Sequence, residues 1–290
     1  MDGVLVIDKP KDMTSHDVVD IARKALSTKR IGHTGTLDPN ATGVLVLAIG
    51  KATKLVKYFT NDSKTYVCKF IIGQAYDSDD ITGKLTDELD ASHLKPEEIK
   101  KELMSFLGKQ TQLPPDYSAV KFQGKKLYEL ARRDIKVTSI EPREVEIIDM
   151  NDPEIVYHEK TVEINVTMKV SKGTYIRAIA RDLGKQLNNF GCLAELRRTQ
   201  VNQFSIEDSF TIEQLQKSEV EIKEPFAYLD LPKIYVDKDV KDYIEHGRFL
   251  DLELFPEKTD TIIFSKEKEP LAIYYYDEVK NLMRMSVKWC

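Results

Sequence analysis

The sequence predicts an α+β protein whose C-terminal end forms a small β-rich unit. Two observations carry this prediction. Apolar runs typical of strands alternate with apolar residues at helical spacing through the first two hundred residues. Beyond Pro225 and Pro232 the composition changes, and residues 234–290 contain short strand-like runs separated by turns. Because 290 residues exceed one typical domain, we expect one domain over residues 1–232 and a second over residues 233–290.

The N-terminal region begins with a predicted strand and helix. Residues 4–7 are all apolar and are typical of a short buried strand. Thr14, with Asp17 three residues later, matches the pattern of a capping box. Apolar side chains then follow at helical spacing, which predicts a helix over residues 16–27.

The middle of the chain continues this alternation. Pro96 opens a helical pattern that ends before Pro114. Ser171 begins a turn that leads into a clearly amphipathic helix from Ile176. The other elements predicted by spacing are strands over residues 66–72, 143–149 and 161–170, an extended segment over 117–122 and a basic helix near 125–133.

Composition excludes several classes of protein. No apolar stretch approaches the roughly 18 to 20 residues that span a bilayer, and the first residues do not resemble a signal peptide. The three cysteines, Cys68, Cys192 and Cys290, are scattered and predict no disulfide framework. The five histidines do not cluster with them, so no zinc site is expected. We therefore expect a cytoplasmic protein with no membrane partner.

The net charge of −5 hides an uneven distribution along the chain. Residues 1–70, 117–138 and 163–204 each carry a charge of +4, and acidic stretches separate them. If these basic blocks meet in the fold, they would form a surface for RNA or DNA. Ordinary charge scatter explains the same counts, and the sequence by itself leaves both readings open.

A glycine-rich loop with a single acid is the most informative stretch of the chain. Residues 32–43 contain three glycines, one proline and one carboxylate, that of Asp38, and the apolar run 44–49 follows at once. Glycines permit tight turns and close approach to a ligand, and Pro39 stiffens the chain after the acid. Asp38 is therefore a candidate nucleophile or general base, with a solvated turn aspartate as the alternative.

Motifs of several other enzyme classes are absent from the sequence. It contains no GxxxxGK[ST] phosphate loop, no GxGxxG after a strand and no GxSxG nucleophile elbow. Residues 77–80 resemble the start of a calcium-binding loop. Ile81 and Thr82 then occupy positions that require an oxygen ligand and a glycine, so a polar surface loop is predicted there.

Aromatic and cationic residues occur together in the basic blocks. Tyr66 starts a predicted strand, Tyr175 and Arg177 alternate along a short segment, and Arg197 and Arg198 lie near a predicted turn. An aromatic ring that stacks on an extruded base, with arginine on a phosphate or carboxylate, is a common way to handle a flipped nucleotide. Buried tyrosines and solvated arginines are the alternative.

Six motifs, taken together, resemble those of the bacterial tRNA pseudouridine synthase B family, in the same order and from Val4 to about Phe204. They are Lys9-Pro10 with Thr14-Ser15, residues 32–43, residues 50–54, residues 114–121, residues 171–177 and residues 196–199. The resemblance implies a pseudouridine synthase fold with a largely antiparallel central sheet, flanked by helices and loops, and a short PUA-like RNA-binding domain at the C-terminus. It also implies that uridine 55 in the T loop of tRNA is isomerised to pseudouridine, without a metal or cofactor.

The resemblance also assigns roles to residues. Asp38 corresponds to the catalytic aspartate, Tyr66 to the tyrosine that stacks on the flipped base and Arg177 to the arginine that pairs with the aspartate. The residues expected to contact the substrate are His33, which would fill the gap left by the base, and Tyr66, Tyr175, Leu196 and Lys9. The sequence does not choose between attack of Asp38 on C1′ and removal of the 2′ proton.

Three positions depart from the family pattern, because Asp12, Asp134 and Asn202 stand where glycine is usual. The expected partner is the T arm of tRNA, and the expected state is a monomer with no obligatory protein partner. Two alternatives remain: a non-catalytic tRNA-binding or tRNA-folding protein, and a synthase that acts on another RNA.

Overall fold

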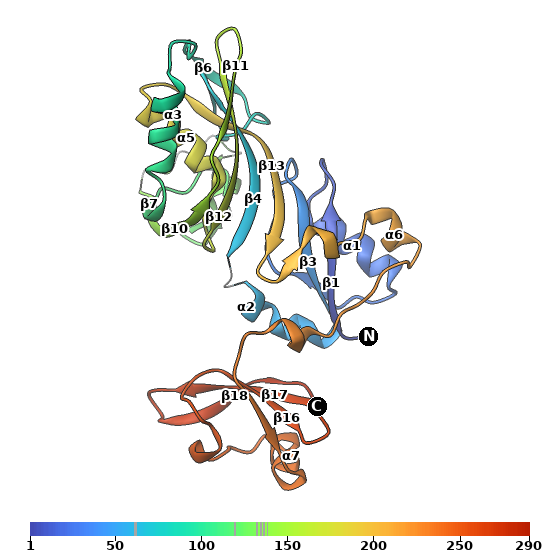
Figure 1. Ribbon diagram of the computed structural model, residues 1–290. Coiled ribbons are helices and arrows are strands. Elements are labelled where there is room, and N and C mark those ends of the chain that lie inside the picture. The colour runs from blue at the N-terminus through green and yellow to red at the C-terminus, as the bar shows by residue number, and fades with distance from the viewer. Residues whose placement is uncertain (61–62, 119, 132, 134, 136, 138) are drawn as a thin grey trace.

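The computed structural model describes residues 1–60, 63–118, 120–131, 133, 135, 137 and 139–290. A long mixed sheet forms the larger part of the molecule, and a smaller sheet lies below it in Figure 1. The strands of the long sheet are, in chain order, β1 (Gly3–Lys9), β2 (Ile31–His33), β3 (Thr42–Ile49), β4 (Lys64–Ile72), β7 (Gly108–Gln112), β10 (Arg143–Met150), β11 (Glu154–Tyr157), β12 (Val162–Val170), β13 (Gly191–Val201) and β14 (Phe204–Ser205).

The strand order across this sheet is β1-β3-β13-β4-β12-β10-β7, with β2, β14 and β11 paired to β3, β13 and β12. Among the described strand pairs of this sheet, only β3 and β13 run parallel. The predicted α+β class with a largely antiparallel central sheet is therefore confirmed. The parallel contact joins Arg197 to Thr42 and Arg198 to Gly43, at the point where the glycine-rich loop enters β3.

Helices cover both halves of the long sheet (Figure 1). Helices α3 and α5 lie beside the half formed by β4, β12 and β10, and α1 and α6 lie beside β1 and β3. The helices are α1 (Ser15–Ala25), α2 (Val56–Phe59), α3 (Pro96–Met104), α4 (Leu127–Ala131), α5 (Ile176–Gln186), α6 (Ile212–Gln216) and α7 (Lys238–Glu245), with short 3₁₀ turns η1 (Gly50–Leu55), η2 (Ile206–Asp208), η3 (Pro225–Tyr228) and η4 (Leu252–Leu254).

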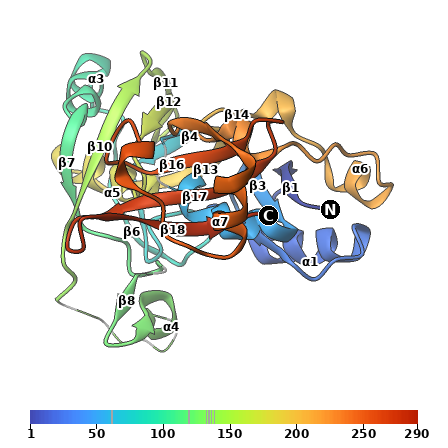
Figure 2. The same cartoon turned by 90° about the horizontal axis from the view of Figure 1, so that it is seen from below.

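Two small hairpins are separate from both the long sheet and the smaller sheet. One pairs β5 (Gln74–Tyr76) with β6 (Leu85–Glu88), and the other pairs β8 (Lys121–Phe122) with β9 (Lys125–Lys126). In Figure 2 the second hairpin and α4 project from the body of the molecule. Several basic side chains of the block 117–138 therefore lie on a protruding segment.

Helix α1 forms for the local reasons that its sequence predicts. The Thr14 hydroxyl accepts a hydrogen bond from the backbone of Asp17, whose carboxylate accepts one from the Thr14 backbone, so the capping box is confirmed. The helix buries Val18 and Ala22 against an apolar cluster that includes Leu45 of β3. This packing places the start of α1 next to the glycine-rich loop.

The core is divided between the two halves of the sheet. One apolar cluster surrounds β4, β12, α3 and α5 and includes Leu37 and Tyr66. A second begins at Val4 and Val44, passes through Phe226 of η3 and continues into the C-terminal residues. The long sheet and the smaller sheet therefore share one of their apolar clusters.

The smaller sheet has the order β15 (Lys233–Val236), β16 (Thr261–Ser265), β17 (Pro270–Asp277) and β18 (Leu282–Lys288). It packs on η1 and α2, where the side chains of Lys51, Lys54 and Tyr58 donate hydrogen bonds to atoms of residues 286–289. The predicted strands are present, whereas α7 is a helix that the sequence pattern does not reveal. Within the part of the chain that the structure describes, no helix has the length and apolar character needed to cross a membrane.

Candidate active site

The glycine-rich loop is fixed to the start of α1 by hydrogen bonds. Buried Ser15 accepts a bond from the Leu37 amide at 2.8 Å, and its hydroxyl lies 3.1 Å from the Leu37 carbonyl. The Asp12 amide donates to the Pro39 carbonyl over 2.9 Å. The backbone on both sides of Asp38 is therefore held before any substrate arrives.

Two buried cations bind the same loop from the interior. Arg198 is 1% exposed, and its guanidinium donates to the carbonyls of Val44 at 2.7 Å, Gly35 at 3.0 Å and Thr36 at 3.4 Å. Lys9 is fully buried and donates to the Pro39 carbonyl at 3.2 Å. Buried charges are costly unless they are hydrogen-bonded, so these contacts tie the loop to the core.

The close approach of β13 to the loop requires Gly43. Its φ of +102° lies in the region that favours glycine, and a Cβ there would come within 2.1 Å of the Arg198 carbonyl oxygen. The missing side chain lets the backbone of Arg198 lie directly against the end of the loop.

Asp38 forms an ion pair with Arg177. The carboxylate and a guanidinium nitrogen are 3.0 Å apart, and the Asp38 side chain is 45% exposed while that of Arg177 is 8% exposed. Arg177 lies in the first turn of α5, the helix predicted from Ile176, so it does not alternate with Tyr175 along one extended segment. The arrangement presents one charged carboxylate at the surface and orients it from below.

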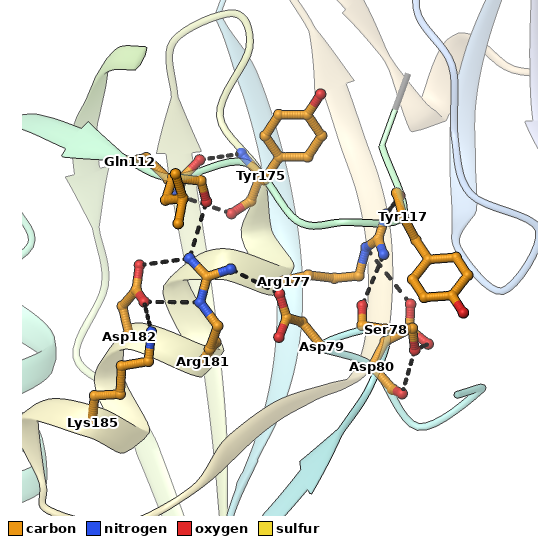
Figure 3. Close-up of polar contacts among 11 residues, drawn as sticks. Ser78, Asp79, Asp80, Gln112, Tyr117, Tyr175, Arg177, Arg181, Asp182 and Lys185 are labelled. Atoms are coloured by element: carbon orange, nitrogen blue, oxygen red, sulfur yellow. Dashed lines mark hydrogen bonds and ion pairs between the residues drawn. The ribbon is translucent and has the colours of Figure 1, made fainter. Parts of the chain in front are cut away.

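A turn at residues 77–83 holds Arg177 in place, as Figure 3 shows. The guanidinium donates to the carbonyls of Ser78 and Tyr117, each at 2.9 Å, and its Nε lies 3.6 Å from the carboxylate of Asp80. Asp80 in turn accepts a bond from the Thr82 amide at 2.9 Å.

The prediction of a polar surface loop at residues 77–80 is therefore wrong. Ser78 and Asp80 are buried, because an arginine from a distant helix neutralises the acid. Asp80 is a site residue that the sequence analysis missed.

Tyr66 and Leu196 lie close to the loop. Tyr66 of β4 is 7% exposed and belongs to the same apolar cluster as Leu37, and Leu196 packs against that cluster. In the register of β4 and β13, Tyr66 pairs with Arg198. Leu196, Arg197 and Arg198 thus occupy the middle of β13, not the vicinity of a turn.

Tyr175 directly precedes α5, and His33 ends β2. The backbone of Tyr175 makes two hydrogen bonds with the buried side chain of Gln112, at 2.7 and 3.0 Å. His33, at the end of β2, has a buried Nδ1 without a hydrogen-bond partner among the described residues. Burial, together with the charges of Arg198 and His16, lowers the pKa of His33, which favours the neutral form of its ring.

Two of the three residues that stand where the family usually has glycine adopt a backbone conformation that favours glycine. Asp12 and Asn202 have φ values of +63° and +49°, in the left-handed region that glycine enters most readily. Asp134, and Ala119 of the motif 114–121, lie outside the described residues. Within the described ranges, no group of three or more histidine, cysteine or acidic side chains is arranged to hold a metal ion.

Family models match most of the chain. A model of the TruB family pseudouridylate synthase (N-terminal domain) matches residues 23–176. A model of the tRNA pseudouridylate synthase B C-terminal domain matches residues 177–231. Asp38, Tyr66 and Tyr175 fall within the first match, and Arg177 and Leu196 fall within the second.

Individual proteins show the same similarity. The chain is 39% identical to tRNA pseudouridine synthase B of Bacillus subtilis (strain 168), over 97% of this chain and 95% of that protein. It is 38% identical to the protein of the same name from Caldanaerobacter subterraneus subsp. tengcongensis, over 86% of each chain.

A solved structure, that of a Cbf5-Nop10-Gar1 complex, contains a chain that superimposes with a TM-score of 0.70 at 22% identity, covering 99% of this chain and 84% of that one. At this identity the likeness concerns the fold alone.

Proposed function

Because this chain belongs to the TruB family and is a tRNA pseudouridine synthase, we propose that it isomerises uridine 55 in the T loop of tRNA. The observation that carries the proposal is the ion pair between Asp38 and Arg177, formed on a loop whose backbone is fixed on both sides. A half-exposed carboxylate held in this way is suited to act on a sugar that is brought to it.

The reaction requires few chemical groups. The N1–C1′ bond breaks, the detached uracil turns in its pocket, C5 joins C1′, and the proton leaves C5 while N1 gains one. In our proposal the Asp38 carboxylate either attacks C1′ or removes the 2′ proton, and in both routes it must be ionised. Arg177 pairs with the carboxylate at 3.0 Å and orients it. No cofactor is needed for this sequence of bond changes.

The target base must leave its stack to reach Asp38. Extrusion costs a few kcal/mol, and in our proposal stacking on Tyr66 returns on the order of 1 to 3 kcal/mol. Tyr175 and Leu196 would bind the flipped nucleotide from the α5 and β13 sides, and the neutral His33 ring would occupy the space that the base vacates.

Lys9 has a different part in this proposal from direct contact with RNA. Its ammonium donates to the carbonyls of Pro10, Met13 and Pro39, at 2.9, 2.6 and 3.2 Å. An ammonium has three protons to donate, so these bonds occupy all of them. We assign Lys9 to the support of the Asp38 loop.

We also propose that the enzyme acts in the cytoplasm as a monomer, with the T arm of tRNA as its partner. The C-terminal residues 233–290 would extend the RNA contact as a PUA-like domain, and residues 1–232 would carry the catalysis. Sizing of the protein with and without tRNA tests whether it is a monomer. Cross-linking to tRNA tests whether residues 233–290 contact the RNA.

The proposal is tested with Asp38→Asn and a tRNA transcript that carries uridine 55, alongside a transcript with cytidine at that position. The variant should form no pseudouridine while binding tRNA with nearly normal affinity. Asp152→Asn changes an exposed acid on a remote loop and should match the wild type, which makes it the control. Pseudouridine formed by Asp38→Asn would refute the role of the carboxylate.

Mapping of modified uridines in bulk RNA tests the substrate separately. Loss of pseudouridine at tRNA position 55 in cells without the protein is the expected result. Loss at a position in another RNA, with tRNA unchanged, would favour a different substrate. A deuterium label at C2′ then separates the two chemical routes, because only removal of the 2′ proton gives a primary isotope effect.

A further inference from the structure

Helix α5 carries a second arginine one turn beyond Arg177. Arg181 is four residues further along, so both side chains lie on the same side of the helix. Its guanidinium lies 2.9 Å from the Asp79 carboxylate and donates to the Leu113 carbonyl over 3.0 Å. Figure 3 shows this second set of contacts beside that of Arg177.

The two arginines bind the same two segments. Each contacts the turn 77–83, Arg177 through Ser78 and Asp80 and Arg181 through Asp79. Each also donates to a carbonyl of the segment 113–117, Arg177 to Tyr117 and Arg181 to Leu113. Those two carbonyls flank Pro114 and Pro115, which make the segment between them stiff.

Asp79 is held in a conformation that needs support. Its φ of +61° lies in the left-handed region, its side chain is 16% exposed, and its carbonyl accepts a bond from the Leu193 amide of β13. Burial raises the pKa of Asp79, which Arg181 opposes. Arg181 is also bound through two contacts by Asp182, at 2.9 and 3.1 Å, so its own position is well defined.

We propose that Arg181 and Asp79 are positioning residues for catalysis, which fix the turn 77–83 and the segment 113–117 so that both hold Arg177 against Asp38. This inference rests on the proposed role of the Asp38–Arg177 pair. Arg181 touches neither the loop of Asp38 nor the exposed carboxylate in the contacts that the structure describes. Its effect must therefore pass through Asp79, whose chain neighbours Ser78 and Asp80 both contact Arg177, or through Leu113, whose segment carries the Tyr117 carbonyl.

Arg181→Met keeps the length and apolar stem of the side chain and removes the guanidinium. We expect its single-turnover rate to fall by about 10- to 100-fold, because small misplacements of a catalytic group have effects of this size. The dissociation constant for tRNA should change by less than about twofold, since ground-state binding does not use this contact. Asp79→Asn keeps an acceptor oxygen and should lose less activity than Arg181→Met.

Lys185→Met is the matched control. Lys185 lies one further turn along α5 and pairs with Asp182 at 3.2 Å, but it makes no described contact with the turn 77–83. It should retain the wild-type rate. All rates are measured well below the melting temperature of each variant, so that a loss of stability alone would leave them unchanged.

A double-variant cycle separates this inference from the proposed function. In an Arg177→Met background, Arg181→Met should slow the reaction by less than about twofold, because the group it positions has been removed. A wild-type rate for Arg181→Met, or an equal loss in both backgrounds, would overturn the positioning role. A wild-type rate for Arg177→Met would instead contradict the proposed function itself.

Discussion

The ammonium of Lys9 and the carbonyl of Pro39 are joined by a hydrogen bond of 3.2 Å, one residue beyond Asp38. Lys9 is at the end of β1 and is fully buried. The loop of Asp38 is thus tied to the first strand, β1, through Lys9 and to α1 through Ser15. Because the Lys9 ammonium can lose a proton, we expect its support of the loop to depend on pH.

Burial lowers the pKa of Lys9 to about 8, against the opposing charge of Asp38. As the pH rises through this value the ammonium loses a proton, and with it the charge and one of three donors. We expect the single-turnover rate to fall between pH 7 and 9 for the wild type. In Lys9→Met the rate should be lower and flat over the same range, so an unchanged alkaline decline in this variant would contradict the assignment.

The same pKa predicts the opposite trend for stability. The unfolded chain keeps the Lys9 proton up to the ordinary pKa of about 10.4, whereas the folded chain releases it near 8. Over that interval the unfolded state binds more protons, so the contribution of Lys9 to the free energy of unfolding increases with pH. Urea unfolding of the wild type and Lys9→Met, compared at pH 7.5 and 9.5, measures the difference. A Lys9 contribution that falls with pH would show that the burial effect is absent.

Arg198→Lys should damage both stability and rate. A lysine supplies one nitrogen where Arg198 uses three to reach Val44, Gly35 and Thr36, so it leaves buried carbonyls unpaired. We expect the free energy of unfolding to fall by about 2 to 4 kcal/mol, as measured by urea unfolding. Arg30→Lys, an exposed site bonded to Thr53, serves as the control and should change it by less than about 0.5 kcal/mol.

Tyr66→Phe separates stacking from hydroxyl chemistry. The ring is retained, so tRNA affinity should stay within about twofold of the wild type. If the hydroxyl helps to remove the C5 proton, as we expect, the single-turnover rate should fall by about 10²-fold or more. Tyr66→Leu should lose affinity as well, by an amount that corresponds to about 1 to 3 kcal/mol of stacking. An unaltered rate in the phenylalanine variant would reduce Tyr66 to a stacking surface.

The turn between β13 and β14 offers a test of backbone strain. Asn202 has a φ of +49° there. Asn202→Gly and Asn202→Ala both remove the amide side chain, but only alanine has a Cβ that resists this conformation. The glycine variant should be more stable than the alanine variant by about 1 kcal/mol, as measured by thermal unfolding. Equal stabilities would mean that the turn relaxes at no cost.

Regular local patterns predicted much of the fold. The strand at residues 4–7, the capped helix from Thr14 and the amphipathic helix from Ile176 are all present, because each has a clean period and clear ends. The central strand β13 is the main omission. It contains glutamate and two arginines in its middle, and its pairing with β4 has two register irregularities, so no two-residue period survives in the sequence.

The site was predictable only in part for a related reason. Asp38 stands out because its loop has an unusual local composition, and the resemblance to a family supplied Arg177. The burial of Asp80 depends on an arginine almost a hundred residues away, which no local pattern contains. Lys9 likewise looks like a surface lysine until three carbonyls are placed around it.

The apolar cluster that joins the two sheets makes residues 1–232 depend on residues 233–290 for the burial of some of their side chains. Phe226 lies 4.8 Å from Trp289 between ring centres, and Leu229, Ile273 and Val287 belong to the same cluster as Val4. A protein cut at residue 232 would lack Ile273, Val287 and Trp289. Side chains of the larger part that belong to this cluster, among them Phe226 and Leu229, would then contact water. We expect such a fragment to self-associate, so residues 233–290 cover apolar surface of the larger part in addition to the RNA contact that we propose for them.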